Sequence, residues 1–256
     1  MNAKTNMNIL ITAGGTTERI DDVRGITNMG TGTLGALIAE GFAASEAVAR
    51  IFYVCSARAV RPECEKVVVY VADDTRTLER AVNDICAEQR VDVVIHSMAV
   101  SDYRVRSVST SREMGAYIAA QLEEGDAKEI ARAIEGTPSI VSGGKVSSGL
   151  DDMVVIMERT PKIIAMFRGL LPDAVIVGFK LLVDVNEDEL IDTAHKLLKK
   201  NDCDYVLAND LRDIRDGGHT GHLLRGDGAY TTYRGKDVIA PGVVRAVLGE
   251  AEWRQR

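Results

Sequence analysis

Cysteine is scarce in this sequence, and no cysteine has a partner at a spacing typical of metal or redox chemistry. The 256 residues include four cysteines, which form neither a C-x-x-C pair nor a Cys/His cluster: Cys55, Cys64, Cys86 and Cys203. This spacing excludes a zinc ribbon and argues against a disulfide framework. We therefore expect isolated, reduced thiols.

His219 and His222 stand close together in a glycine-rich stretch, but they lack companions. A metal site needs further carboxylate, cysteine or histidine ligands at suitable spacing. None accompanies this pair, so we expect no metal site there.

Excess positive charge is missing, and so are long apolar runs. The chain has 31 Lys and Arg against 38 Asp and Glu, a formal net charge of −7, which argues against gripping a nucleic-acid backbone. No apolar run approaches the roughly 18 residues of a membrane span. The strand-like MNILITA begins at Met7 and leaves no room for a signal peptide. We expect a soluble, cytoplasmic protein that binds neither nucleic acid nor membranes.

Short apolar runs of strand length alternate with helix-period segments along most of the chain. The runs are continuous rather than alternating and rich in Val and Ile, which is typical of buried parallel strands. They lie at residues 8–13, 50–55, 66–71, 91–97, 153–157, 174–179 and 204–208. Helices are predicted at 33–42, 74–89 and 187–200, each with one apolar face. This order predicts an α/β fold: a Rossmann-like, mainly parallel open sheet with flanking helices.

Two regions interrupt the alternation. Residues from about 104 to 150 are polar, with a helical stretch at 112–135 and then the loop SGGKVSSG. Near the end, alternation at 229–233 and a turn at Arg234 and Gly235 predict a small antiparallel hairpin at a sheet edge, before a helix at 242–253. We expect one α/β domain over residues 1–256, with a flexible insert or flap at about 104–150.

Two glycine-rich turns are the clearest local signals for a ligand site. Gly14 and Gly15 follow the first predicted strand at its carboxyl end, where open α/β sheets bind ligands. The string 30–35 (GTGTLG) leads into a helix, whose first N–H groups favour an anion. Together the turns predict a phosphate cradle. The alternative is two tight connections that need glycine only for positive φ.

The second turn is a literal G-x-G-x-x-G, but its context does not fit a dinucleotide site. That fingerprint needs its first glycine directly after the first strand, whereas here about sixteen residues follow Ala13 before it. No Asp or Glu ends the next strand to bind a ribose hydroxyl, and no Tyr-x-x-x-Lys pair occurs. Two alternatives stay open: an NADP-dependent reductase with Arg58 at the 2′-phosphate, and a non-catalytic nucleotide-sensing protein.

The order of further motifs resembles one enzyme family. Residues 11–18 (ITAGGTTE), 21–28 (DDVRGITN) and the 30–35 turn are followed by 98–104 (MAVSDYR), 145–148 (KVSS), 160–164 (TPKII), 177–180 (VGFK), 199–201 (KKN) and 208–210 (AND). Over about residues 7–245 this order resembles the phosphopantothenate–cysteine ligases, the phosphopantothenoylcysteine synthetases of coenzyme A biosynthesis. The chain is similar to the free-standing bacterial form, because a fused flavin-dependent decarboxylase domain has no room. We therefore expect no flavin.

The resemblance implies a reaction in two steps. CTP activates the carboxylate of 4′-phosphopantothenate as an acyl-cytidylate and releases pyrophosphate. The amine of L-cysteine then displaces CMP to give 4′-phospho-N-pantothenoylcysteine. Both steps develop negative charge, so the protein must mainly position groups and stabilise charge. Mg²⁺ is expected with the triphosphate, bound mostly through it, and the family implies a homodimer.

The resemblance also assigns catalytic and substrate-binding residues. Lys145, in the SGGKVSSG loop, is expected to reach over the triphosphate, although a solvated loop lysine is the alternative. Asn28 is assigned to the acyl-cytidylate. Arg24 and Asn209 are assigned to substrate binding, with an ion pair to Asp21 or Asp22 as the alternative for Arg24.

A larger set of residues is assigned to the nucleotide. It comprises Gly14, Gly15, Thr16, Gly30, Thr31, Gly32, His96, Ser97, Met98, Asp102, Lys145, Pro161, Lys162, Ile163, Ile164, Phe179, Lys196 and Lys200. The backbone of 96–98 is the expected base-reading edge, and 161–164 open a helix that could hold phosphate. Each of four assignments has a structural alternative. Asp102 could cap a strand–loop junction, Phe179 could be a core residue, and the two lysines could complement the helix dipole.

The chain departs from the fused bacterial pattern in three places. A long insert, 103–144, separates Asp102 from Lys145, and the cysteine-containing site of the decarboxylase is absent. Phe179 is followed by Lys-Leu-Leu rather than by small and acidic residues. Some eukaryotic members share this last feature and can use ATP. We nevertheless expect CTP.

Overall fold

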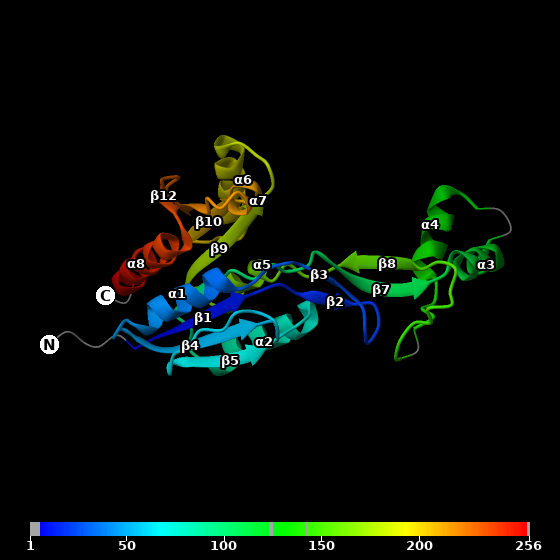
Figure 1. Cartoon of the computed structure of the whole chain (residues 1–256), viewed down its shortest axis with the longest axis horizontal. Helices are drawn as coiled ribbons and strands as arrows, with labels where there is room; N and C mark the ends of the chain where they lie inside the picture. Colours follow the sequence, from blue (N-terminus) through cyan, green and yellow to red (C-terminus); the bar gives the residue numbers. More distant parts are fainter. Residues whose placement is uncertain (1–5, 123–124, 142, 255–256) are drawn as a thin grey trace. The chain divides into compact units, whose positions relative to one another are not determined.

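The computed structural model describes residues 6–122, 125–141 and 143–254 and divides the chain into two compact units (Figure 1). Unit 1 comprises Met1–Thr16, Met29–Val100 and Lys162–Arg256. Unit 2 comprises Thr17–Asn28 and Ser101–Pro161. Each unit contains sheets of its own.

Unit 1 is built on an eight-stranded sheet in the order β12-β11-β10-β9-β6-β1-β4-β5. The parallel strands are β1 (Met7–Ala13), β4 (Val48–Cys55), β5 (Val67–Val71), β6 (Val93–His96), β9 (Val175–Leu182) and β10 (Tyr205–Asp210). At one end β11 (Thr220–Arg225) and β12 (Tyr230–Arg234) pair antiparallel. The predicted Rossmann-like, mainly parallel open sheet is confirmed.

Helices cover both faces of this sheet. α1 (Thr33–Ala43) and α8 (Lys236–Arg254) pack on one face, and α2 (Thr75–Glu88), α5 (Ile164–Leu170) and α6 (Glu187–Lys200) pack on the other. A short α7 (Leu211–Arg215) follows β10. Along β1, Ile9 and Ile11 belong to the first core cluster and Leu10 to the second. Both faces are buried, which explains why the strands read as continuous apolar runs.

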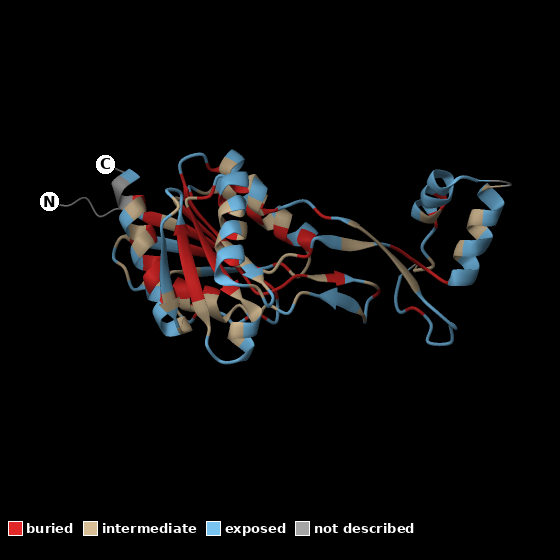
Figure 2. Ribbon diagram, turned by 90° about the horizontal axis from the view of Figure 1, so that it is seen from above, coloured by how far each residue is buried: buried red, intermediate tan, exposed pale blue. Residues whose placement is uncertain are grey.

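Unit 2 holds two small antiparallel sheets and two helices. β2 (Thr17–Arg19) pairs with β3 (Gly25–Thr27), and β7 (Tyr103–Ser109) pairs with β8 (Val154–Arg159). α3 (Ser111–Gln121) has no buried residue, and α4 (Ala127–Gly136) buries only Ala133 among the residues described (Figure 2). The two helices therefore leave most of their side chains exposed.

Two sequence predictions about elements were wrong, and a third was incomplete. The segment at 153–157 is not in the main sheet: it forms β8, whose half-buried residues pair with β7. The helical stretch at 112–135 is two helices. The hairpin turn lies between Arg225 and Tyr230, where Gly228 has φ 87°, while Gly235 (φ 89°) separates β12 from α8.

The last helix begins at Lys236 rather than at Gly242 as predicted. Pro241 lies inside it rather than before it. Ser142 of the predicted loop lies outside the described residues. Within the part of the chain that the structure describes, no helix is long and apolar enough to cross a membrane.

Candidate functional site

The order of the strands reverses beside β1. After β1 the chain builds β4 and β5 on one side, and then β6, β9 and β10 on the other. Open α/β sheets bind ligands at the carboxyl ends of the strands beside such a reversal. At this edge Gly14 follows β1 and Ser97 follows β6, so the structure brings together two segments predicted to bind the nucleotide.

Backbone hydrogen bonds join these two segments beyond the ends of their strands. The Ser97 N–H donates to the Thr12 carbonyl at 3.0 Å and the Ala99 N–H to the Gly14 carbonyl at 2.8 Å. The Thr16 N–H donates back to the Ala99 carbonyl at 3.1 Å. The edge is therefore a connected piece of backbone rather than two independent loops.

The second glycine turn packs directly on the first. A Cβ on Gly30 would lie 2.4 Å from the Gly14 carbonyl oxygen, and Gly32 has φ +77°. A Cβ on Gly35 would lie 2.7 Å from the Ala13 Cβ. Close packing and positive φ both require these glycines, which supports the structural alternative for them.

The same packing places the start of α1 at this edge. Gly32 is the N-cap of α1, and no side chain caps the helix. The Thr33 N–H donates to Thr31 Oγ1 at 3.4 Å. The next N–H groups of the first turn are available to an anion, and the helix dipole favours negative charge there. The glycines thus allow the helix to begin at this edge of the sheet.

His96 ends β6 with its ring in the core. Its Nδ1 lies 2.8 Å from Thr12 Oγ1, and its ring meets the edge of Phe167 at a centroid distance of 5.3 Å. Burial lowers the pKa of His96 to about 4, so the ring is neutral at pH 7 and can accept the Thr12 proton. The Met98 N–H in turn donates to Thr12 Oγ1 at 3.4 Å. The side chain of His96 therefore packs in the core and helps to hold the edge of the sheet. Its backbone, not its side chain, is the part available to a nucleotide base.

Asp102 and Pro161 belong to unit 2, and both are exposed. The Asp102 carbonyl accepts the Thr160 N–H at 3.1 Å. Lys162 and the buried Ile163 precede α5 in unit 1, and their carbonyls each accept an N–H of the first helical turn at 3.0 Å. The predicted helix start is present, but it opens a helix of only 7 residues.

Phe179 and Asn209 lie on neighbouring strands of unit 1. Phe179 is half-buried and packs against the core on the α1 face, as its structural alternative required. Asn209 is buried, and its Nδ2 donates to the Thr220 carbonyl at 2.7 Å. The amide nitrogen of Asn209 therefore joins β10 to the start of β11, which leaves its oxygen for any contact with substrate.

The nucleotide-binding assignment of Lys196 and Lys200 stays a prediction, and the structure places the end of their helix away from the glycine turns. Just after α6 the Asp204 N–H donates to the carbonyl of Ile176, near the start of β9, at 2.9 Å. α6 therefore ends at the amino edge of the sheet, opposite the glycine turns. Lys200 is its last residue, and Lys196 forms an ion pair with Asp192 at 2.6 Å. The structure does not bring these lysines together with the glycine turns, because helical spacing sets a shared face but not an edge.

Asn28, Lys145 and Arg24 all belong to unit 2. Lys145 is exposed, Asn28 is half-buried directly after β3, and no described residue forms a hydrogen bond or ion pair with either side chain. Arg24 Nη2 lies 3.1 Å from Asp21 Oδ2 and donates to the Val146 carbonyl at 2.6 Å. The ion pair left open as the alternative for Arg24 is therefore formed.

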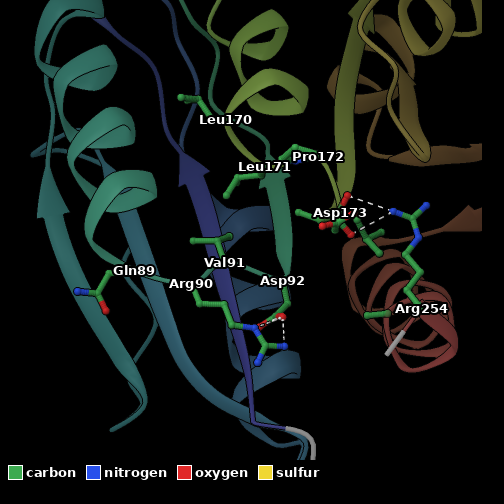
Figure 3. A pocket seen from close by; sticks show the side chains of 12 residues that line it. Gln89, Arg90, Val91, Asp92, Leu170, Leu171, Pro172, Asp173 and Arg254 are labelled. Atoms are coloured by element: carbon green, nitrogen blue, oxygen red, sulfur yellow. Dashed lines mark hydrogen bonds and ion pairs between the residues drawn. The ribbon is translucent and has the colours of Figure 1, made fainter. Parts of the chain in front are cut away.

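The pocket in Figure 3 is separate from this site. It measures about 760 Å³ and lies at the amino edge of the sheet, among residues that precede β6 and β9 and the end of α8. Its arginines are paired: Arg90 Nε donates to Asp92 Oδ1 at 2.8 Å, and Arg254 Nη1 to the Ala174 carbonyl at 3.2 Å. No predicted site residue lines it.

No group of three or more His, Cys, Asp or Glu side chains stands ready to hold a metal ion within the described ranges. Two residues outside the set assigned to the site also support the edge. Ala99 bridges to Gly15, and the Tyr53 hydroxyl donates to the Val60 carbonyl at 2.9 Å beside the second glycine turn. An alanine side chain has no functional group that would mark it in a sequence, and Tyr53 has the pattern of an ordinary strand residue.

The sequence matches a known family over nearly its whole length. Residues 4–112 and 104–248 match the DNA/pantothenate metabolism flavoprotein C-terminal domain. The chain belongs to this family. The family resemblance drawn from the order of the motifs is confirmed.

Curated relatives and solved structures support the same family. The coenzyme A biosynthesis bifunctional protein CoaBC of Thermococcus kodakarensis is 30% identical over 207 residues, 80% of this chain and 41% of that protein. That of Mycobacterium bovis is 29% identical over 247 residues, 94% of this chain and 51% of that protein. The chain therefore spans about half the length of the curated relatives it matches.

The DNA/pantothenate metabolism flavoprotein structure from Streptococcus pneumoniae is 32% identical, with a TM-score of 0.80 over 95% of this chain and 99% of that one. A Cab2 variant in complex with phosphopantothenate-cysteine is 17% identical, with a TM-score of 0.70 over 98% of this chain and 88% of that one. At that identity the Cab2 structure shows the shared fold.

Proposed function

We propose that this protein is a phosphopantothenate–cysteine ligase that uses CTP. The observation that carries the proposal is the family match over residues 4–248. The glycine turns and the start of α1 at the sheet reversal support a site for an anion there. The naming of its relatives for coenzyme A biosynthesis, and of a structural neighbour for its complex with phosphopantothenate-cysteine, supports the substrate class. We further propose that both units work as one ligase domain.

The chemistry has two displacements. A carboxylate oxygen of 4′-phosphopantothenate attacks the α-phosphorus of CTP, and the bond to the β-phosphate breaks to release pyrophosphate. The cysteine amine then attacks the acyl carbon and loses a proton, while the bond to CMP breaks. Mg²⁺ would arrive with the triphosphate, because it keeps water and phosphate oxygens as ligands.

The chain's own groups would position the reactants and stabilise charge. The N–H groups at the start of α1 would face the phosphates of the nucleotide. Lys145 would oppose the charge of the triphosphate, and Asn28 would hold the acyl-cytidylate. The N–H groups of Ser97 and Met98 already donate to Thr12, so this edge offers carbonyl acceptors to a base. Cytosine and adenine both present an amino donor there, whereas guanine and uracil present an oxygen.

The proposed function is tested by pyrophosphate release. The protein should release pyrophosphate only when 4′-phosphopantothenate and a nucleoside triphosphate are both present, and should form the amide when cysteine is added. A reductase would oxidise NADPH and release none. A sensor would bind nucleotide without turnover. Either result would overturn the proposal.

CTP should be preferred over ATP. The comparison is kcat/KM for each nucleotide at saturating 4′-phosphopantothenate. GTP and UTP should be weak substrates, because guanine O6 and uracil O4 stand where adenine N6 and cytosine N4 carry the amino donor. An ATP preference of tenfold or more, about 1.4 kcal/mol in transition-state free energy, contradicts the proposal of CTP.

We also propose that the protein is a homodimer assembled through unit 2. In support, α3 buries no side chain within the described residues, and Ile130 of α4 is 40% exposed. Burial of an exposed apolar side chain such as Ile130 against another surface is favourable. Sedimentation should give a dimer, and Ile130→Glu should shift it towards the monomer. A wild-type protein that is fully active and strictly monomeric would refute the dimer.

A further inference from the structure

The loop that carries Lys145 is fastened to the hairpin turn of unit 2. The Val146 N–H donates to Asp21 Oδ2 at 3.0 Å, and the Val146 carbonyl accepts Arg24 Nη2 at 2.6 Å. On the other side of Lys145, the Gly144 carbonyl accepts the Asp22 N–H at 3.2 Å. Both chain neighbours of Lys145 are therefore held, while its own side chain is exposed.

Asp21 is the centre of this attachment. Its side chain has no exposed surface. Oδ1 accepts the N–H groups of Val23 at 2.8 Å and Arg24 at 2.7 Å, and Oδ2 accepts Val146 and pairs with Arg24. Burial alone would raise the pKa of Asp21, but the N–H donors of Val23, Val146 and Arg24 and the Arg24 charge lower the pKa to about 2. The group therefore stays a carboxylate at any pH at which the enzyme is assayed.

The turn that Asp21 organises belongs to the β2–β3 hairpin, and Asn28 follows β3 directly. The same hairpin therefore carries Asn28 at its end and holds the Lys145 loop at its turn. Positioning of this kind matters, because a charged group lowers a barrier only when it is held where charge develops.

We infer that Asp21 is a positioning residue that acts through Lys145, by holding the 143–149 loop on the hairpin that leads to Asn28. This inference rests on the proposed function for the role of Lys145 itself. Arg24 is the second part of the same attachment, since it binds both Asp21 and Val146.

Asp21→Asn tests the attachment directly. It replaces one acceptor oxygen with an NH2 group that faces N–H donors, so the loop should detach. Trypsin cleaves after lysine, and cleavage of the folded protein between Lys145 and Val146 should be at least tenfold faster in the variant. Asp22→Asn is the matched control, because it removes the same charge next door from an exposed side chain and retains the Asp22 N–H. Its cleavage rate should equal that of the wild type.

Arg24→Lys provides a second variant should Asp21→Asn not fold. It keeps the charge and the buried carboxylate but removes the bond from Nη2 to the Val146 carbonyl, so it should also speed cleavage after Lys145. If the variants that fold are cleaved at the wild-type rate, Asp21 does not hold the loop.

A double-mutant cycle distinguishes positioning from general support of the fold. If Asp21 acts through Lys145, Asp21→Asn combined with Lys145→Gln should slow cysteine-independent pyrophosphate release no further than Lys145→Gln alone. Losses that multiply would overturn the inference. The cleavage experiment does not depend on ligase activity. A protein without ligase activity would refute the proposed function, and the cleavage rates would still show whether Asp21 holds the 143–149 loop.

Discussion

Lys145→Gln should slow the first half-reaction by about 10²–10³, the usual cost of losing one well-placed charge-stabilising donor. Lys145 is expected to act while pyrophosphate leaves, when negative charge on the triphosphate oxygens is greatest. Its side chain is exposed and bonded to no described residue, so the ammonium group is free for a ligand. The measurement is cysteine-independent pyrophosphate release in a single turnover.

Lys128→Gln is the matched control for this variant. Lys128 is an exposed lysine of the same unit, on α4, and its substitution removes the same charge. It should release pyrophosphate at the wild-type rate. If both lysine variants lose activity alike, the effect is one of net charge, and the specific role of Lys145 is wrong.

Asn28→Asp should spare activation and impair amide formation by a similar factor, about 10²–10³. A neutral amide can hold the acyl-cytidylate carbonyl without adding charge. A carboxylate at the same place stands beside the phosphate of the intermediate and repels it, so cysteine attack should slow. Quenched-flow analysis should therefore detect accumulated acyl-cytidylate in this variant.

Asn83→Asp makes the same amide-to-carboxylate change on α2 of unit 1 and should leave both half-reactions unaltered. The two catalytic predictions also check each other. If Lys145→Gln accumulates the acyl-cytidylate and Asn28→Asp does not, the assignment of the two half-reactions is reversed.

The sequence by itself determined the fold class and the elements of the main sheet. Residues 8–13 and 187–200 were predicted almost to their observed bounds, because continuous apolar runs and a one-sided apolar period are local consequences of burial. The sequence also predicted two glycine turns near one edge of the sheet, and the structure packs Gly30 against Gly14 there. Short chain segments at the ends of parallel strands must meet at one edge of the sheet, and that follows from topology alone.

Tertiary structure alone decided how distant parts pair. The strand at 153–157 joins β7 rather than the main sheet, since pairing depends on residues about fifty positions away. α6 ends at the amino edge of the sheet, because the direction of a crossover helix sets which of its ends meets the carboxyl ends of the strands. Arg24 binds Asp21 and Val146, and the second partner is 122 positions away in the chain. A sequence pattern records which face a residue occupies, whereas long-range contacts decide its partner.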